Sequence, residues 1–286
     1  MLKAILASAF LVAGTLVVGA QTIDNSALEK SDFRAHARTF GLVYILPHAV
    51  NDKLATTIGG MLREDLLKAG LTTEALMFNI PHVTVVHIHN SDPTTPEKML
   101  KVLPSLPGRI DLTLKTFYTT EAAKDAGRPW WLDLGIVKEG KGYEKMMAFN
   151  VTATAALAPL RDGPLPRVTG PVYAKMGDAA KSLVQTMGVS GVNIMQDGKA
   201  TSAHNPHNTL VYSMAPFTPA VQAAMNETAK NFNQVLPNGI ETTFATVSIV
   251  ELAFAGNVLR EIYRIDLDSG SVLEIATGKA MKLAKN

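Results

Sequence analysis

Cysteine is absent from this 286-residue sequence. A chain without cysteine forms no disulfides, so its fold must be stabilised by a hydrophobic core. For an exported protein, this absence fits a bacterial periplasm better than a disulfide-rich extracellular setting. About 266 residues (286 − 20) follow the first 20 residues, which is ample for one substantial core.

A strong charge of one sign is also absent. The 27 Lys and Arg residues nearly balance the 25 Asp and Glu residues, and the formal net charge is +2. Removal of an N-terminal segment that contains Lys3 would leave +1. Long nucleic acids are bound largely by neutralising many phosphates with Lys and Arg, so this balance argues against such a partner. A small ligand fits better.

Long apolar runs are missing everywhere except at the N-terminus. Lys3 precedes an apolar run from Ala4 to Val18, and small residues stand before Gln21. This pattern is typical of a secretory signal peptide. The alternative is an uncleaved membrane anchor, but the run is short for a bilayer, which needs ~20 apolar residues. We therefore expect a signal peptide at 1–20, a flexible leader at 21–38, and an exported protein, periplasmic or secreted, without a membrane anchor.

Two copies of a short motif lie 125 positions apart, Pro81-His82-Val83-Thr84 and Pro206-His207-Asn208-Thr209. Each copy is followed by two apolar residues, and the β-branched neighbours favour a strand in each case. Side chains alternate along a strand, so His82 and Thr84 share one face, as do His207 and Thr209. One such motif is common by chance, whereas a matched pair is a hypothesis about function.

The residues around the motifs predict alternating strands and helices. Four helices are expected. They lie at 52–69, with Asn51 as the cap, at 96–102, at 142–160, and from Pro219 to about 235, with Thr218 as the cap. The strands are expected at 41–47, 79–88, 109–118, 130–137, from His207 onward, 241–254 and 258–267.

The paired motifs and this element order resemble the two-histidine phosphoesterase superfamily, over roughly residues 39–268. The superfamily includes 2′,3′-cyclic phosphodiesterases and 2′-5′ RNA ligase-like proteins. The resemblance implies an α+β, two-lobed, pseudo-twofold fold, in which antiparallel sheets flank a central cleft and helices lie outside. It places one such domain at 39–286, with an insertion at about 161–205 that compact members of the superfamily lack.

The resemblance also implies four catalytic residues, His82, Thr84, His207 and Thr209, and no cofactor. In-line cleavage of a phosphodiester places the attacking and leaving oxygens on opposite sides of phosphorus. One neutral imidazole can take a proton from water while an imidazolium protonates the leaving oxygen, since the ordinary histidine pKa of about 6.5 makes both forms accessible. The two threonine hydroxyls can donate hydrogen bonds to phosphate oxygens. The order of the motifs does not assign the acid and the base.

A metal site is the alternative role for the nearby histidines. His87 and His89 share a strand face, a spacing that some zinc sites use. Strict alternation puts both opposite His82 and Thr84 unless a bulge intervenes. No acidic residue or cysteine accompanies them at a recognisable ligand spacing, so we expect no metal.

Three aromatic residues are candidates for substrate binding: Tyr212, Trp130 and Trp131. Members of the superfamily often carry a basic residue three positions after the second threonine, where this chain has Tyr212. Strict alternation puts Tyr212 on the face opposite His207 and Thr209. The two tryptophans point to opposite faces of one strand, so one is expected in the core and the other could stack a base.

The resemblance implies a metal-independent phosphodiesterase that acts on a small nucleotide or a short RNA and hydrolyses 2′,3′-cyclic nucleotides or short oligonucleotides. We expect it to be a monomer. A binding protein that holds a nucleotide or phosphate ligand on the same fold without turnover is an alternative, which the missing basic residue favours. A 2′-5′ RNA ligase-like activity is a second alternative.

Overall fold

The computed structural model describes residues 38–71, 76–78, 80–119, 130–161, 195–196, 199–200, 206–213, 218–252, 256 and 258–283. The expected signal peptide, nearly all of the expected leader and most of the expected insertion lie outside the described residues. Among the helices that the structure describes, none is long and apolar enough to cross a membrane.

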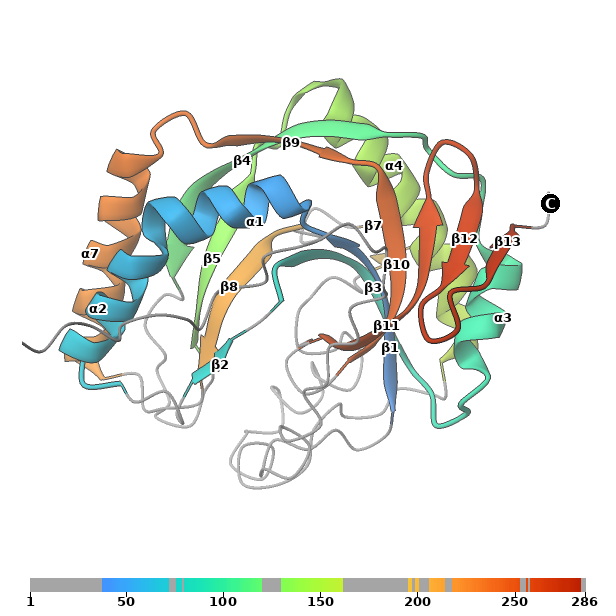
Figure 1. The fold of residues 1–286 in the computed structure, drawn as a ribbon, viewed down its shortest axis with the longest axis horizontal. Coiled ribbons are helices and arrows are strands. Elements are labelled where there is room, and N and C mark those ends of the chain that lie inside the picture. The colour runs from blue at the N-terminus through green and yellow to red at the C-terminus, as the bar shows by residue number, and fades with distance from the viewer. Residues whose placement is uncertain are drawn as a thin grey trace, which may run out of the picture.

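One mostly antiparallel sheet of eleven strands organises the chain (Figure 1). Ten strands follow the order β13-β12-β11-β10-β1-β3-β8-β5-β4-β9, and β2 pairs with β8 beside this path. Their bounds are β1 Thr39–Ile45, β2 Leu76–Phe78, β3 His82–His89, β4 Ile110–Thr119, β5 Trp130–Ile136, β8 Asn208–Ser213, β9 Ile240–Phe244, β10 Thr246–Leu252, β11 Val258–Asp266, β12 Ser271–Glu274 and β13 Ala280–Lys282. A two-stranded sheet, β6 Met195–Gln196 and β7 Lys199–Ala200, is separate.

The helices of the described chain are α1 His48–Leu54, a π-helical turn at Ala55–Gly59, α2 Gly60–Lys68, α3 Thr95–Val102, α4 Gly140–Leu157, a 3₁₀ turn at Ala158–Leu160, and α7 Pro219–Val235. This composition confirms the predicted α+β class. The Thr218 cap is also confirmed, because its hydroxyl accepts a hydrogen bond from the Val221 amide at 3.2 Å. The Asn51 cap is wrong. The helical run begins at His48, directly after Pro47, and Asn51 instead donates its side-chain amide to the Leu46 carbonyl.

The helices that the structure describes all pack on the same face of the sheet. Their buried apolar side chains belong to one continuous core with the strands. Behind β3, the Tyr44 hydroxyl donates to Asn150 of α4 at 3.1 Å. Behind β4, the Phe117 and Phe232 rings meet edge to face, with centroids 5.3 Å apart. We call this the helical face. The opposite face, on which no described helix packs, carries a separate apolar cluster made of strand residues, Val43, Val250, Leu252 and Val258. We call it the open face for that reason alone.

The two halves of the sheet meet at β3 and β8 through a single residue pair, Val83 and Asn208. A second connection is made by β9 and β10, which only Ala245 separates along the chain. β9 pairs with β4 in one half, whereas β10 pairs with β1 in the other, so this bent segment spans both halves (Figure 1). The predicted single strand at 241–254 is therefore wrong. The sheet is continuous, and its division into two lobes stays a prediction.

Two β-bulges change the alternation of side chains near the junction. In β3, Val85 is an extra residue, because Leu42 pairs with Val86 while Val43 pairs with Thr84. In β8, Leu210 is an extra residue, because Val211 and Thr209 pair with consecutive residues of β5. A bulge moves every later side chain of its strand to the other face of the sheet.

Helix α4 supports the site strands from behind, and one glycine allows its close approach. A Cβ atom at Gly142 would lie 1.6 Å from the backbone oxygen of Asp111 in β4. We expect Gly142→Ala to lower the free energy of unfolding by about 1–3 kcal/mol, as overpacking does. Gly60→Ala is the matched control, because a Cβ there meets nothing within 4 Å. It should raise stability by about 0.5–1 kcal/mol. Urea unfolding measures the free energy of unfolding of both variants. Equal changes in the two variants would contradict the close packing of Gly142 against β4.

Candidate functional site

The register at the β3–β8 junction brings the two motifs together. Val83 and Asn208 are paired, and both are fully buried on the helical face. In an antiparallel pair the flanking residues project to the other side. This puts His82 across from Thr209, and Thr84 across from His207, all four on the open face. The structure therefore gathers the four predicted catalytic residues into one place.

His82 is held as a neutral imidazole. Its side chain is only 4% exposed, and its Nδ1 lies 2.5 Å from the backbone carbonyl of Ile80. A carbonyl only accepts, so Nδ1 carries the hydrogen and Nε2 is left with a lone pair. Burial lowers the pKa of His82 to about 4, the Ile80 hydrogen bond opposes the shift, and the charge of His207 adds to it. His82 is thus equipped to accept a proton near neutral pH.

His207 lies beside a buried carboxylate, Asp133 of β5. Its Nε2 is 3.9 Å from Asp133 Oδ2, and the Asp133 side chain is only 2% exposed. Asp133 pairs directly with Thr209, whose hydroxyl donates a hydrogen bond to the carboxylate. Burial raises the pKa of Asp133 to about 6, while His207 and the Thr209 hydrogen bond lower it. The two histidines therefore sit in opposite environments, one buried against a carbonyl and one facing a carboxylate.

Sequence reasoning missed Asp133. The only signal was a single acidic residue within the otherwise apolar segment Trp130–Ile136. A charged residue is seldom fully buried unless it is paired, so an acid in such a strand indicates a specific partner. The identity of that partner depends on which strand lies next to β5, and this is a property of the topology.

The bulge at Val85 corrects the prediction for the other two histidines. Residues 39, 41 and 43 of β1 share a face, and they pair with His89, His87 and Thr84 respectively. His87 and His89 thus lie on the same face as Thr84, not on the opposite one. Both are buried, and His89 Nδ1 is 2.9 Å from the Thr39 hydroxyl. The described residues contain no group of three or more potential metal ligands, and the expected absence of a metal stays a prediction.

The bulge at Leu210 corrects the prediction for Tyr212 in the same way. Trp131 and Asp133, two apart on β5, pair with residues 212 and 209. Position 212 therefore lies on the open face with Thr209, although the side chain of Tyr212 is outside the described residues. Trp131 is half-buried on this face, so it is the tryptophan placed to contact a ligand. The side chain of Trp130 also lies outside the described residues.

Tyr118 of β4 is a further aromatic residue on the open face, and sequence reasoning missed it. It pairs with Asp133, and a Cβ atom at Gly135 would lie 3.3 Å from its ring. The ring therefore extends over Gly135, which the register aligns with His207. An extra residue in β4 next to Thr116, which has a φ of 74°, puts Tyr118 on the face opposite to the one that strict alternation from Leu114 would give.

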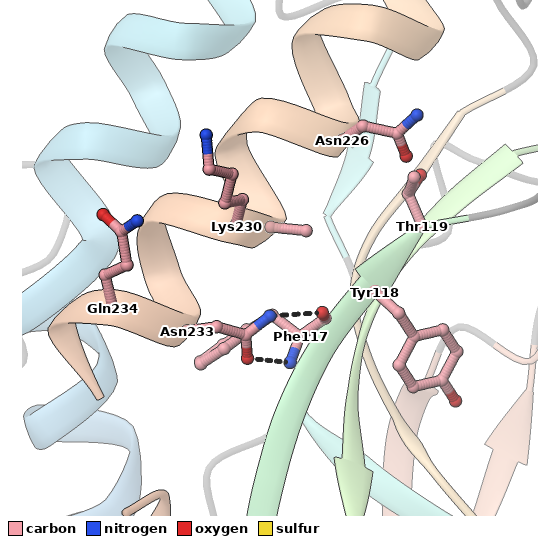
Figure 2. Close-up of a pocket in the computed structure, with 8 residues that line it drawn as sticks. Phe117, Tyr118, Thr119, Asn226, Lys230, Asn233 and Gln234 are labelled. Atoms are coloured by element: carbon pink, nitrogen blue, oxygen red, sulfur yellow. Dashed lines mark hydrogen bonds between the residues drawn. The ribbon is translucent and has the colours of Figure 1, made fainter. Parts of the chain in front are cut away.

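A groove of about 510 Å³ between α7 and β4 lies on the helical face (Figure 2). Phe117 and Asn233 meet at its base, joined by two hydrogen bonds, while Tyr118 points away from the helix. The groove contains none of the four motif residues. We therefore place the candidate site on the open face at the β3–β8 junction and not in this groove.

No protein-family model matches the chain, and no curated protein matches it. Several solved structures are similar in fold. Usb1 from Kluyveromyces marxianus has 7% sequence identity and a TM-score of 0.39, over 76% of this chain and 97% of that one. The structure of Kluyveromyces marxianus Usb1 with uridine monophosphate has 8% sequence identity and a TM-score of 0.36, with the same coverage of both chains. A conserved protein of unknown function from Agrobacterium tumefaciens has 12% sequence identity and a TM-score of 0.41, over 80% of this chain and 87% of that one.

The buried Asp133 predicts a specific pH dependence of stability. Its pKa of about 6 lies above the ordinary 3.8, so the folded protein binds more protons than the unfolded chain between these values. Its contribution to the free energy of unfolding must then fall as pH rises from 4 to 6. Asp133→Asn removes this titration. Relative to the parent, the variant should gain up to about 3 kcal/mol between pH 4 and pH 7 in urea unfolding.

Asp111→Asn, which neutralises an exposed carboxylate on β4, is the matched control for Asp133→Asn. The Asp111 side chain is exposed to solvent, so the stability of this variant relative to the parent should change far less over the same pH range. A similar pH response in the two variants would contradict the burial of the Asp133 carboxylate.

Proposed function

We propose that this protein is a metal-independent phosphodiesterase that uses His82 and His207 as a general base and a general acid. One observation carries the proposal: the pairing of Val83 with Asn208 puts both His-x-Thr motifs on one face of the sheet. Each histidine then has an environment suited to one half of an in-line displacement. His82 is neutral with Nε2 as a proton acceptor, and His207 has its Nε2 3.9 Å from the buried carboxylate of Asp133.

The proposed reaction follows from these positions. A water molecule attacks phosphorus, and its proton passes to His82 Nε2 as the new P–O bond forms. The imidazolium of His207 gives its proton to the leaving oxygen as the opposite P–O bond breaks. Thr84 and Thr209 lie on the open face with the two histidines. Their hydroxyls can contact the phosphate oxygens or the side chains that bind the phosphate. After release of the product, the two imidazoles exchange protons with solvent to restore the starting state.

The substrate we propose is small, a 2′,3′-cyclic nucleotide or a short oligonucleotide. The formal net charge of +2 gives no electrostatic reason to expect a long nucleic acid as the substrate. Aromatic residues border the histidines, because Trp131 and Tyr118 both lie on the open face next to Asp133. Each ring offers a surface on which a base could stack. We further propose that the protein acts outside the cytoplasm, on the basis of residues 1–20, which N-terminal sequencing of the native protein would test.

Replacement of either histidine should abolish most of the activity. We expect His82→Ala or His207→Ala to lower kcat on uridine 2′,3′-cyclic phosphate by about 10²–10⁴-fold, the usual contribution of a positioned acid or base. The double variant should lose far less than the product of the two single effects, because neither role is useful without the other. The rate should follow a bell-shaped pH profile, with the acidic limb set by the base and the basic limb by the acid.

His48→Ala is the matched control, since His48 is exposed on α1 and pairs with Asp52. It should leave the rate unchanged, and EDTA should do the same to the parent enzyme. Small and equal effects of His82→Ala and His207→Ala would contradict the mechanism. Retained binding of uridine 2′,3′-cyclic phosphate without any turnover would instead favour a nucleotide-binding protein.

A further inference from the structure

A buried carboxylate is an unexpected neighbour for a site that binds an anion. Asp133 is only 2% exposed, and its Oδ1 has no hydrogen-bond partner among the described residues. A phosphodiester carries one negative charge, and two negative charges a few ångströms apart repel strongly where water is excluded. Binding of a phosphodiester next to an ionised Asp133 is favourable only if a positive charge or an additional proton lies between them.

The groups around Asp133 show where that proton would reside. The titratable side chains that face it from neighbouring described strands are Tyr118 on β4, His207 on β8 and, one strand further, His82 on β3. Tyrosine is neutral at pH 7, and His82 is kept neutral by burial. The proton must therefore reside on the pair formed by His207 and Asp133.

We propose that Asp133 is a positioning residue that keeps a proton on His207 when a phosphodiester binds, which makes His207 the acid and His82 the base. This inference rests on the proposed function and deepens it, because the two motifs alone leave the roles interchangeable. In the reaction, the proton of the His207 imidazolium moves to the leaving oxygen as its bond to phosphorus breaks. His82 Nε2 receives the proton of the attacking water.

The same carboxylate gives the two threonines different roles. Thr209 donates its hydroxyl hydrogen to Asp133, so this hydrogen is not available to the phosphate. Thr84 has no such carboxylate among its paired residues, since its partner in β1 is Val43. Thr84 is then the hydroxyl donor to the phosphate, and Thr209 fixes the orientation of Asp133.

The test compares two leaving groups in Asp133→Asn, which preserves the shape of the side chain and removes its charge. Opening of uridine 2′,3′-cyclic phosphate expels an alkoxide that needs an acid, whereas thymidine 5′-(p-nitrophenyl phosphate) expels a nitrophenolate that needs little help. Full removal of a general acid costs ~10²–10⁴-fold, so weakening it should lower kcat on the cyclic substrate by about 10–100-fold. The loss on the nitrophenyl ester should be less than about 3-fold, since P–O cleavage there depends little on the acid. Asp111→Asn, which removes an exposed carboxylate from β4, should change neither rate.

A merely structural role for Asp133 would lower both rates equally, and that result would overturn the inference while leaving the proposed function intact. Unchanged rates on both substrates would overturn it as well. If the parent enzyme turned over neither substrate, the proposed function would fail and this inference with it.

A binding measurement on the parent protein tests the role of Asp133 even if the Asp133→Asn variant does not fold. Thymidylyl-(3′→5′)-thymidine is a phosphodiester monoanion that does not titrate between pH 6 and pH 8.5. Its affinity should fall as pH rises, approaching about tenfold per pH unit where the free pair has lost its proton. In Asp133→Asn the fall should begin at a lower pH. An affinity that stays constant from pH 6 to pH 8.5 would overturn the inference.

Discussion

The pairing of Val83 with Asn208 is the contact on which the site depends. It is the one residue pair that joins β3 to β8, and both side chains are buried on the helical face. That burial fixes the register, because a slip of one residue would move the two motifs to opposite faces of the sheet. The bent segment of β9 and β10 and the core shared by the helices hold the halves in place around this short contact.

Burial and charge then distinguish two histidines that are identical in their motifs. His82 is enclosed and hydrogen-bonded to a backbone carbonyl, which disfavours its charged form. His207 is closer to solvent, and its Nε2 lies 3.9 Å from Asp133 Oδ2. Titratable groups in contrasting environments are the usual basis for dividing acid and base roles. Here, the division comes from β5, a strand that belongs to neither motif.

Local sequence patterns predicted most of the strands and helices. They predicted the four motif residues of the candidate site but not the residues that surround them. The strands of both motifs and helices such as α4 and α7 follow from periodicity and capping, and all are present. The bulges at Val85 and Leu210 did not follow, because one extra residue leaves no mark on composition. They are the reason that His87, His89 and Tyr212 were expected on the wrong face. Asp133 and Tyr118 reach the site only through strand order, which no single segment encodes.

An imidazole ¹⁵N NMR titration of His82, in the parent protein and in His207→Gln, tests most directly whether the two motifs meet in one buried site. We expect His82 to keep its hydrogen on Nδ1 and to titrate near pH 4 rather than near the ordinary 6.5. Its pKa should be higher in the variant, because the positive charge of His207 is gone. A His82 that titrates near 6.5 in both proteins would contradict the claim that the two motifs meet in one buried site.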